Sequence, residues 1–214
     1  MEDNQSDPNI VPQKVLDRYE VIETIGTGGT GTVFKAKDTH LPRIIAIKAL
    51  NPNKESAKNI VRLHKEARTI CQLRHPNIVE IYDFIIANRK EPMMVMEFVE
   101  GKSLECIIAE QGAMSLRESL DIFLQICDAM DYAHSRGVLH RDLAPSNILV
   151  SPGPKGRASI KVVDFGVAKV EDLQDNTFSK TGCLVGTVTV ISPEQATGRA
   201  VDARSDVYSM GCLM

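Results

Sequence analysis

The sequence has 214 residues, with 25 lysines and arginines against 28 aspartates and glutamates, and its formal net charge is −3. This near-neutral balance argues against a dedicated nucleic-acid-binding protein. With 43% hydrophobic and 25% charged residues, the composition excludes bulk disorder and predicts one large domain or two compact lobes.

The sequence shows no sign of a membrane segment, a signal peptide or a disulfide framework. Its longest apolar runs have the size of a strand, far short of the roughly 18 residues of a membrane helix. Residues 1–17 are acidic and polar and lack the basic start and apolar core of a signal peptide. The five cysteines are scattered without a CxxC pair. We therefore expect a cytoplasmic protein with reduced thiols, preceded by a flexible tail over residues 1–18.

Short segments rich in valine and isoleucine follow this tail, bounded by glycine, proline or asparagine. They cover residues 19–26, 31–38, 43–50, 77–86 and 92–99. Segments of this kind are typical of the strands of an antiparallel sheet.

Two helices are predicted from apolar residues that recur every three or four positions. The first, over residues 54–73, interrupts the strands. The second, over residues 115–136, begins with Ser115 and Glu118, which fit the capping box that satisfies backbone N–H groups at a helix start. The apolar residues of this second helix are Leu116, Leu120, Phe123, Cys127 and Met130.

The remainder of the chain alternates short strands with long irregular stretches. Residues 147–151 and 159–164 are strand-like and are joined by a loop rich in proline and glycine. Residues 164–204 show little periodicity, and a segment of that length inside a domain is usually functional.

A glycine-rich motif, G-x-G-x-x-G, begins at Gly26. By itself it fits a dinucleotide-binding fold, a protein kinase or an ordinary hairpin. The hypothesis of a dinucleotide-dependent oxidoreductase has no other support in the sequence. A dinucleotide site requires a helix at the third glycine. Residues 32–36 instead continue as a strand. The glycines are therefore expected in a hairpin turn, where backbone N–H groups can approach phosphates closely.

A second candidate is the pair Lys48 and Glu66. The two-residue period of a strand places Ala46 and Lys48 on one face, a small side chain beside a long cation. Glu66 lies at the margin of the apolar stripe of the first predicted helix, from which a carboxylate can reach Lys48. Alternatively, Lys48 is a solvated edge charge and Glu66 a surface partner of Lys65 or Arg62.

Three further motifs follow in order. Residues 140–149 read HRDLAPSNIL, residues 164–166 read DFG, and residues 192–194 read SPE. Together with the glycine motif, Lys48 and Glu66, they make the chain from Tyr19 onward resemble the protein kinase family. Residues 186–187 and the stretch after Ser192 are most similar to the Ser/Thr branch, and within it to bacterial kinases of eukaryotic type.

The resemblance implies an α+β fold of two lobes. Residues 19–98 would form a small N-lobe, an antiparallel sheet with one helix, that binds ATP. Residues 99–214 would form a mainly helical C-lobe, incomplete because the chain ends within the helix that follows the activation segment. We expect a fragment or a prematurely ended gene product.

The resemblance also implies ATP and Mg²⁺ as cofactors and a protein bearing a serine or threonine hydroxyl as partner, with no nucleic acid. Asp142 would accept the hydroxyl proton, Lys48 would bind phosphates with Glu66 orienting it, and Asn147 and Asp164 would hold Mg²⁺. The residues assigned to nucleotide binding are Ile25, Gly26, Thr27, Gly28, Gly29, Thr30, Gly31, Val33, Ala46, Lys48, Met96, Glu97, Val99, Leu149 and Asp164. The apolar members of this set fit an ordinary core nearly as well.

The chain departs from the family's pattern near the reacting groups. Ala144 stands where the Ser/Thr branch has a lysine, and Ser146 stands where tyrosine kinases have an arginine, so the compensating cation is absent in both schemes. Val190 replaces an aromatic residue. The loss of one charge-stabilising contact typically lowers turnover on the order of a hundredfold. The alternative function is therefore a nucleotide-binding, catalytically impaired fragment or a pseudokinase-like interaction module.

Arg141 resembles the arginine that receives a phosphate in kinases activated by phosphorylation. Candidate acceptors in the long segment are Thr177, Ser179 and Thr181. The sequence does not rank them, and it leaves the oligomeric state open.

Overall fold

The computed structural model describes residues 14–15, 17–29, 31–50, 67–87, 91–165 and 190–214. The chain forms two compact units. The first comprises residues 1–60 and 81–98, and the second comprises residues 61–80 and 99–214.

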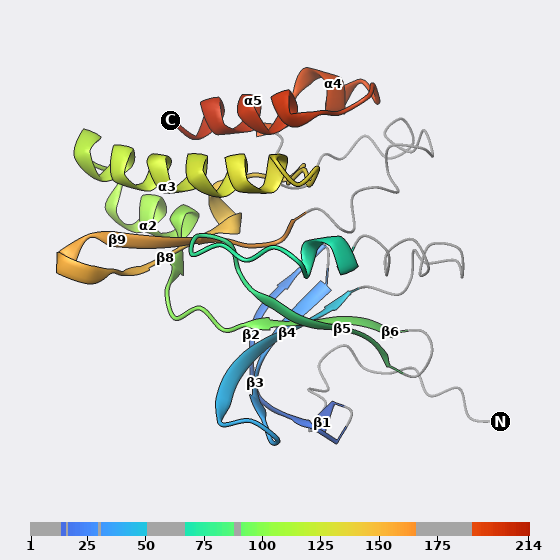
Figure 1. Ribbon diagram of the computed structural model, residues 1–214. Coiled ribbons are helices and arrows are strands. Elements are labelled where there is room, and N and C mark those ends of the chain that lie inside the picture. The colour runs from blue at the N-terminus through green and yellow to red at the C-terminus, as the bar shows by residue number, and fades with distance from the viewer. Residues whose placement is uncertain (1–13, 16, 30, 51–66, 88–90, 166–189) are drawn as a thin grey trace. The chain divides into compact units, whose positions relative to one another are not determined.

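The first unit is built on a six-stranded sheet in the order β1-β2-β3-β4-β6-β5, with every neighbouring pair antiparallel (Figure 1). Its strands are β1 (Lys14–Val15), β2 (Tyr19–Gly28), β3 (Gly31–Asp38), β4 (Arg43–Leu50), β5 (Ile81–Ala87) and β6 (Glu91–Glu97). The predicted antiparallel sheet is therefore confirmed.

One predicted strand, residues 77–86, is wrong at its start. Strand β5 begins only at Ile81, because Asn77 and Val79 belong to the second unit, where their backbone groups hydrogen-bond to Val162. Residues 67–70 are helical, and the rest of the helix predicted over residues 54–73 is either outside the described residues or not helical.

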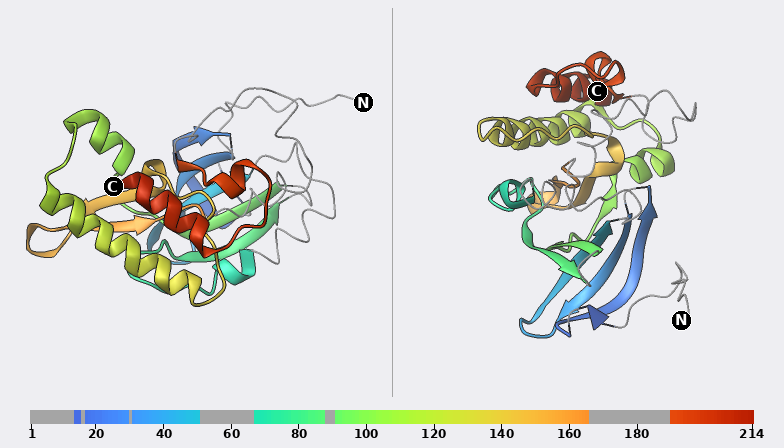
Figure 2. Two further views of the ribbon diagram at one scale, coloured as in Figure 1. Left: turned by 90° about the horizontal axis from the view of Figure 1, so that it is seen from above. Right: turned by 90° about the vertical axis from the view of Figure 1, so that its right-hand side faces the viewer.

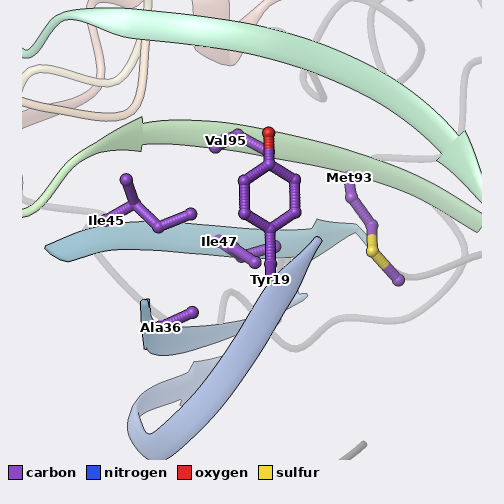
Figure 3. Packing of buried hydrophobic residues seen from close by; sticks show 6 residues of the cluster. All are labelled: Tyr19, Ala36, Ile45, Ile47, Met93 and Val95. Atoms are coloured by element: carbon purple, nitrogen blue, oxygen red, sulfur yellow. The ribbon is translucent and has the colours of Figure 1, made fainter. Parts of the chain in front are cut away.

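The core of the first unit lies on one face of this sheet. Figure 3 shows the ring of Tyr19 among side chains from three other strands. The members of the cluster are Tyr19, Ala36, Ile45, Ile47, Met93 and Val95. Because side chains alternate along a strand, the residues between these belong to the opposite face.

A buried carboxylate, Asp38, fixes the turn from β3 to β4. Its side chain accepts hydrogen bonds from Arg18 at 2.9 and 3.1 Å and from Arg43 at 3.3 Å. It also accepts from the backbone N–H groups of His40 and Leu41 at 3.0 and 3.3 Å. The hydrogen bonds from Arg18 contribute most to holding the pKa of Asp38 far below its usual range, against the effect of burial.

The second unit combines helices with a three-stranded sheet in the order β7-β8-β9. Its elements are β7 (Lys102–Ser103), α2 (Leu104–Gln111), α3 (Leu116–His134), the 3₁₀ turn η2 (Pro145–Asn147), β8 (Ile148–Pro152), the 3₁₀ turn η3 (Pro154–Gly156), β9 (Ala158–Val162), α4 (Pro193–Ala196) and α5 (Ala203–Leu213). Figures 1 and 2 show α3 between the β8–β9 hairpin and α5.

Helix α3 begins as predicted, but it buries a different set of residues. Ser115 and Glu118 form the full capping box. The buried residues are Ile122, Ile126, Ala129, Met130 and Ala133. Leu116 and Leu120, which were expected on the apolar face, are 75% and 40% exposed. Apolar spacing alone does not show which of two overlapping stripes meets the rest of the unit.

Among the described residues, no helix is both long and apolar enough to cross a membrane.

Candidate active site

In the first unit, strand register places four of the predicted nucleotide-binding residues on one face of the sheet. Lys48 of β4 lies opposite Val33 of β3 and Met94 of β6, and Ala46 lies opposite Met96. Residues paired across antiparallel strands share a face. Val33, Ala46, Lys48 and Met96 therefore lie together, on the face opposite the cluster around Tyr19.

Lys48 is 6% exposed. A lysine is rarely buried to this degree without a partner, so this burial disfavours the solvated edge charge that the sequence left open. Its predicted partner, Glu66, lies outside the described residues, as does Thr30.

The glycine motif forms the predicted hairpin, with β2 ending at Gly28 and β3 beginning at Gly31. Gly31 is required by the fold, because its φ is 140° and a Cβ there would lie 2.0 Å from the backbone oxygen of Ala49. A Cβ at Gly26, Gly28 or Gly29 would meet nothing within 4 Å. Packing around a side chain therefore does not explain these three glycines.

The remaining nucleotide candidates of the first unit lie at irregular positions. Ile25 is 46% exposed and falls where the register shifts between Thr24 and Gly26. Thr27 is exposed and pairs with Thr32. Glu97 ends β6, the first unit ends at Phe98, and Val99 is the first residue of the longer stretch of the second unit.

In the second unit, the segment that contains Asp142 is folded back on itself by Asn147. The side-chain Nδ2 of Asn147 donates to the backbone oxygen of Asp142 at 2.8 Å. The backbone N–H of Asn147 donates to the oxygen of Ala144 at 2.9 Å and closes the turn η2. The first hydrogen bond also fixes the Asn147 amide, so that Oδ1 is the atom able to coordinate a cation.

The β8–β9 hairpin brings Asn147 and Asp164 together. Asn147 immediately precedes β8, Asp164 follows β9 by two residues, and Ile148 pairs with Val162. The backbone N–H of Val163 donates to the oxygen of Asn147 at 2.9 Å. Leu149, assigned to nucleotide binding, is half-buried on β8.

The donors at this hairpin suit a hard cation that keeps other oxygen ligands. They offer one carboxylate and one amide, which are ligands that Mg²⁺ accepts when phosphates complete its shell. Within the part of the chain that the structure describes, no group of three or more histidines, cysteines, aspartates and glutamates is placed to hold a metal. With one carboxylate and one amide oxygen, the pair fits Mg²⁺ whose coordination shell a polyphosphate completes.

His140 connects the two halves of this arrangement. Its Nδ1 accepts from the backbone N–H of Asp142 at 3.3 Å, which places the proton on Nε2, 3.0 Å from the oxygen of Val163. The centroid of its ring lies 4.6 Å from the centroid of the Phe165 ring. Burial lowers the pKa of His140, which keeps the ring neutral.

Asp206, in the first turn of α5, is a residue that sequence reasoning missed. It is buried, and its carboxylate accepts from the backbone N–H groups of His140 and Arg141 at 2.8 Å each. It also lies 2.8 Å from Nε2 of His134. An aspartate in the first turn of a helix is ordinarily attributed to the helix dipole, so its sequence position does not point to this role.

Arg141 is held in an unusual conformation beside these groups. Its φ is 63°, and its backbone oxygen accepts from Nε2 of Gln195 at 2.8 Å. Its buried Nε has no hydrogen-bond partner among the described residues. The candidate phosphate acceptors Thr177, Ser179 and Thr181 lie outside the described residues.

Comparison with known proteins identifies the arrangement. The model of the protein kinase domain matches residues 19–214. The chain belongs to the protein kinase family. It is 39% identical over 207 residues to the serine/threonine-protein kinase PknB of Mycolicibacterium smegmatis and 37% identical to PknB of Mycobacterium tuberculosis. These alignments cover 95% of this chain and 32% of each relative, so the chain spans about a third of their length.

Solved kinase structures agree with the fold. The kinase domain of PknI from Mycobacterium tuberculosis has a TM-score of 0.74 at 25% identity, covering 94% of this chain and 74% of that one. Rad53 1–466 in complex with AMP-PNP has a TM-score of 0.74 at 30% identity, covering 92% and 47%. The predicted kinase fold and the resemblance to bacterial Ser/Thr kinases of eukaryotic type are confirmed.

Two residues that depart from the kinase pattern, Ala144 and Val190, are buried in the second unit. Ala144, where the Ser/Thr branch has a lysine, is completely buried. Val190 is also buried, and its backbone oxygen accepts from Oγ of Ser209 at 2.6 Å. Both positions are thus part of the packed interior among the described residues.

Helix α5 of the kinase meets the rest of its unit through polar residues. Its buried residues are Ser205, Asp206, Ser209 and Met210. Oγ of Ser205 donates to the carboxylate of Glu194, and this hydrogen bond is the largest cause of the lowered pKa of Glu194. Each polar residue of this face therefore has a partner in the segment before α5 or in the segment around Asp142.

Proposed function

We propose that this chain binds ATP with Mg²⁺ and transfers the terminal phosphoryl group to serine or threonine hydroxyls of proteins. The observation that carries the proposal is the arrangement at Asn147. The Asn147 side chain donates to the backbone oxygen of Asp142, and the Asn147 backbone oxygen accepts from the N–H of Val163, which precedes Asp164. The proposed base and both proposed metal ligands therefore belong to a single hydrogen-bonded structure.

In this proposal, Asp142 accepts the proton of the substrate hydroxyl while the hydroxyl oxygen attacks the terminal phosphorus of ATP. The bond from that phosphorus to the bridging oxygen breaks, and ADP leaves. Asn147 and Asp164 hold Mg²⁺, which when bound neutralises the charge of the phosphates. These roles agree with the oxygen-donor chemistry of the two side chains.

The first unit supplies the proposed nucleotide contacts. The N–H groups of the hairpin around Gly26, Gly28 and Gly29 face phosphates, and Lys48 binds them as a cation. Val33, Ala46 and Met96, with Ile25, form the apolar surroundings of the adenine, and the backbone of Glu97 binds its edge. The shared sheet face of Val33, Ala46, Lys48 and Met96 supports this assignment.

The proposed partner is a protein substrate, and the proposed compartment is the cytoplasm. Among the described cysteines, Cys106, Cys127 and Cys212 are free thiols, which agrees with a reducing compartment that contains ATP.

The second candidate is nucleotide binding without useful transfer. The observation that favours it is Ala144, which leaves the transferred phosphate without the cation that the Ser/Thr branch provides. In this reading, binding of Mg²⁺-ATP survives while turnover is lost.

Incorporation of labelled terminal phosphate into the chain itself or into a basic protein substrate tests the proposal. We expect incorporation by the parent chain, none by Asp142→Asn, and parental levels in Asp131→Asn, an exposed aspartate of α3. Absent transfer together with an increase in Tm caused by Mg²⁺-ATP would favour the second candidate. Absence of both would reject the two proposals together.

A further inference from the structure

Gln125, in the middle of α3, uses its amide group to connect three segments of the second unit. Its Nε2 donates to the backbone oxygens of Asp121 and Ala158, at 3.0 Å each. Its Oε1 accepts from Nδ2 of Asn77 at 2.9 Å and from the backbone N–H of Ile160 at 3.1 Å. A half-buried glutamine that satisfies both ends of its amide in this way has one orientation only.

Asn77 extends the same contact along β9. Its Nδ2 also donates to the backbone oxygen of Ile160 at 3.1 Å, and its backbone oxygen accepts from Val162 at 2.8 Å. Two residues later, the N–H of Val79 donates to the oxygen of Val162 at 3.0 Å. We call Asn77, Val79 and Gln125 the edge network.

The edge network occupies the side of β9 that β8 leaves unpaired. Alternate residues of a strand present their backbone groups to the same side. The edge network binds backbone groups of Ala158, Ile160 and Val162, which follow this two-residue spacing. The bound edge thus ends one residue before Val163, which precedes Asp164.

Strand register is the property that such an edge controls. A slip of one residue moves a strand by about 3.3 Å and turns every side chain to the opposite face. A strand of five residues paired to β8 alone has little to oppose a slip. The Gln125 amide binds a carbonyl at Ala158 and an N–H at Ile160 simultaneously, and a slip of one residue would break both hydrogen bonds.

We propose that Asn77 and Gln125 are positioning residues that set the register of β9 and thereby the place of Asp164. The assignment of Asp164 as a metal ligand rests on the proposed function. The control of register does not, because it follows from the hydrogen bonds alone.

Three variants test the edge network. Gln125→Met keeps the length of the side chain and removes its hydrogen bonds, and Asn77→Ala removes the other amide in case the first variant fails to fold. Tyr132→Phe is the matched control, since it removes the 3.0 Å hydrogen bond from the N–H of Arg74 to the Tyr132 hydroxyl. That bond joins the same helix to the same segment without touching β9.

The first measurement is hydrogen exchange at the amide of Val163, which donates to the backbone oxygen of Asn147 and not to either variant residue. We expect exchange to become about tenfold faster in Gln125→Met and Asn77→Ala, because a tenfold change corresponds to the free energy of about one hydrogen bond. We expect the exchange rate to be unchanged in Tyr132→Phe. Unchanged exchange in both test variants, or equal acceleration in the control, would overturn the control of register.

The second measurement is the Mg²⁺ concentration that gives half of the increase in Tm produced by a non-hydrolysable ATP analogue. We expect this concentration to rise severalfold in both test variants and to stay parental in Tyr132→Phe. Faster exchange at Val163 with an unchanged Mg²⁺ midpoint would overturn the positioning of Asp164. A parent chain without any Mg²⁺-dependent increase would reject the proposed function, while the exchange result would still decide the control of register.

Discussion

The carboxylate of Asp206 lies 2.8 Å from the backbone N–H of His140, at the start of the segment that contains Asp142. The other oxygen of the same carboxylate lies 2.8 Å from the N–H of Arg141, whose positive φ turns the chain at this point. One side chain of α5 therefore holds two successive peptide groups of a segment more than 60 residues earlier in the chain. A charged acceptor gives stronger hydrogen bonds than a neutral one, and here it satisfies donors that are shielded from water.

Asp206→Asn should destabilise the second unit, because the amide replaces one of two acceptor oxygens with a donor that faces a backbone N–H. We expect the free energy of unfolding in urea to fall by about 3 kcal/mol. Asp202→Asn, at the exposed N-cap of the same helix, should change it by less than ~0.5 kcal/mol, since asparagine caps a helix as well as aspartate does. Equal effects of the two variants would contradict the role assigned to Asp206.

Asp38→Asn should destabilise the first unit in a manner that depends on pH. Hydrogen bonds from Arg18, from the backbone N–H of His40 and from Arg43 hold the pKa of Asp38 below its unfolded value. The stabilisation is therefore fully present above about pH 4 and is lost as the pH falls toward the folded pKa. At pH 7 we expect Asp38→Asn to lower the free energy of unfolding by about 3 kcal/mol, and by roughly half as much at pH 2.5.

The control for Asp38 is Glu20→Gln, an exposed carboxylate of β2 in the same sheet. Urea unfolding of the parent and of both variants at the two pH values provides the measurement. A difference between Asp38→Asn and the parent that does not shrink at low pH would contradict the proposed origin of the stabilisation.

Two glycines of the hairpin should respond differently to alanine. In Gly31→Ala the new Cβ would meet the oxygen of Ala49, and the φ of 140° disfavours any side chain, so we expect a loss of stability of about 2 to 3 kcal/mol. Gly28→Ala meets no atom within 4 Å, and we expect its Tm to lie close to that of the parent while its affinity for ATP falls. Thermal melts with and without nucleotide separate the two effects, and an equally unstable Gly28→Ala would contradict this assignment.

His140 should make stability depend on pH between 5 and 7. Burial lowers its pKa, so the unfolded chain binds the proton more readily than the folded chain, and stability falls as the pH drops below about 6.5. We expect a slope of up to about 1.4 kcal/mol per pH unit, reduced in His140→Gln. Burial also lowers the pKa of His75, which should leave a residual slope in that variant.

Replacement of the exposed His40 by glutamine is the control for this measurement. Free energies of unfolding at several pH values provide the slope for each protein. If His140→Gln and the parent have the same slope, the neutral, hydrogen-bonded state of His140 is refuted.

The local elements of this kinase were predictable because their signals lie within a few residues. The strands from Tyr19 to Leu50 follow from runs of β-branched residues broken by turns, and the start of α3 follows from the capping box of Ser115 and Glu118. The face shared by Ala46 and Lys48 follows from the two-residue period of a strand. The motif residues Asp142, Asn147 and Asp164 were found as a set because their order along the chain matches the family.

The tertiary structure alone decided what each element contacts. The sequence does not show that α3 buries Ile122 and Ile126 rather than Leu116, or that residues around Asn77 pair with β9 rather than extend β5. The same holds for Asp206 and Gln125, whose partners lie far away in sequence. A strand or a helix cap is stabilised by its own neighbours, whereas a buried carboxylate or amide is stable only where a distant segment presents matching backbone groups, and that match exists only in the folded chain.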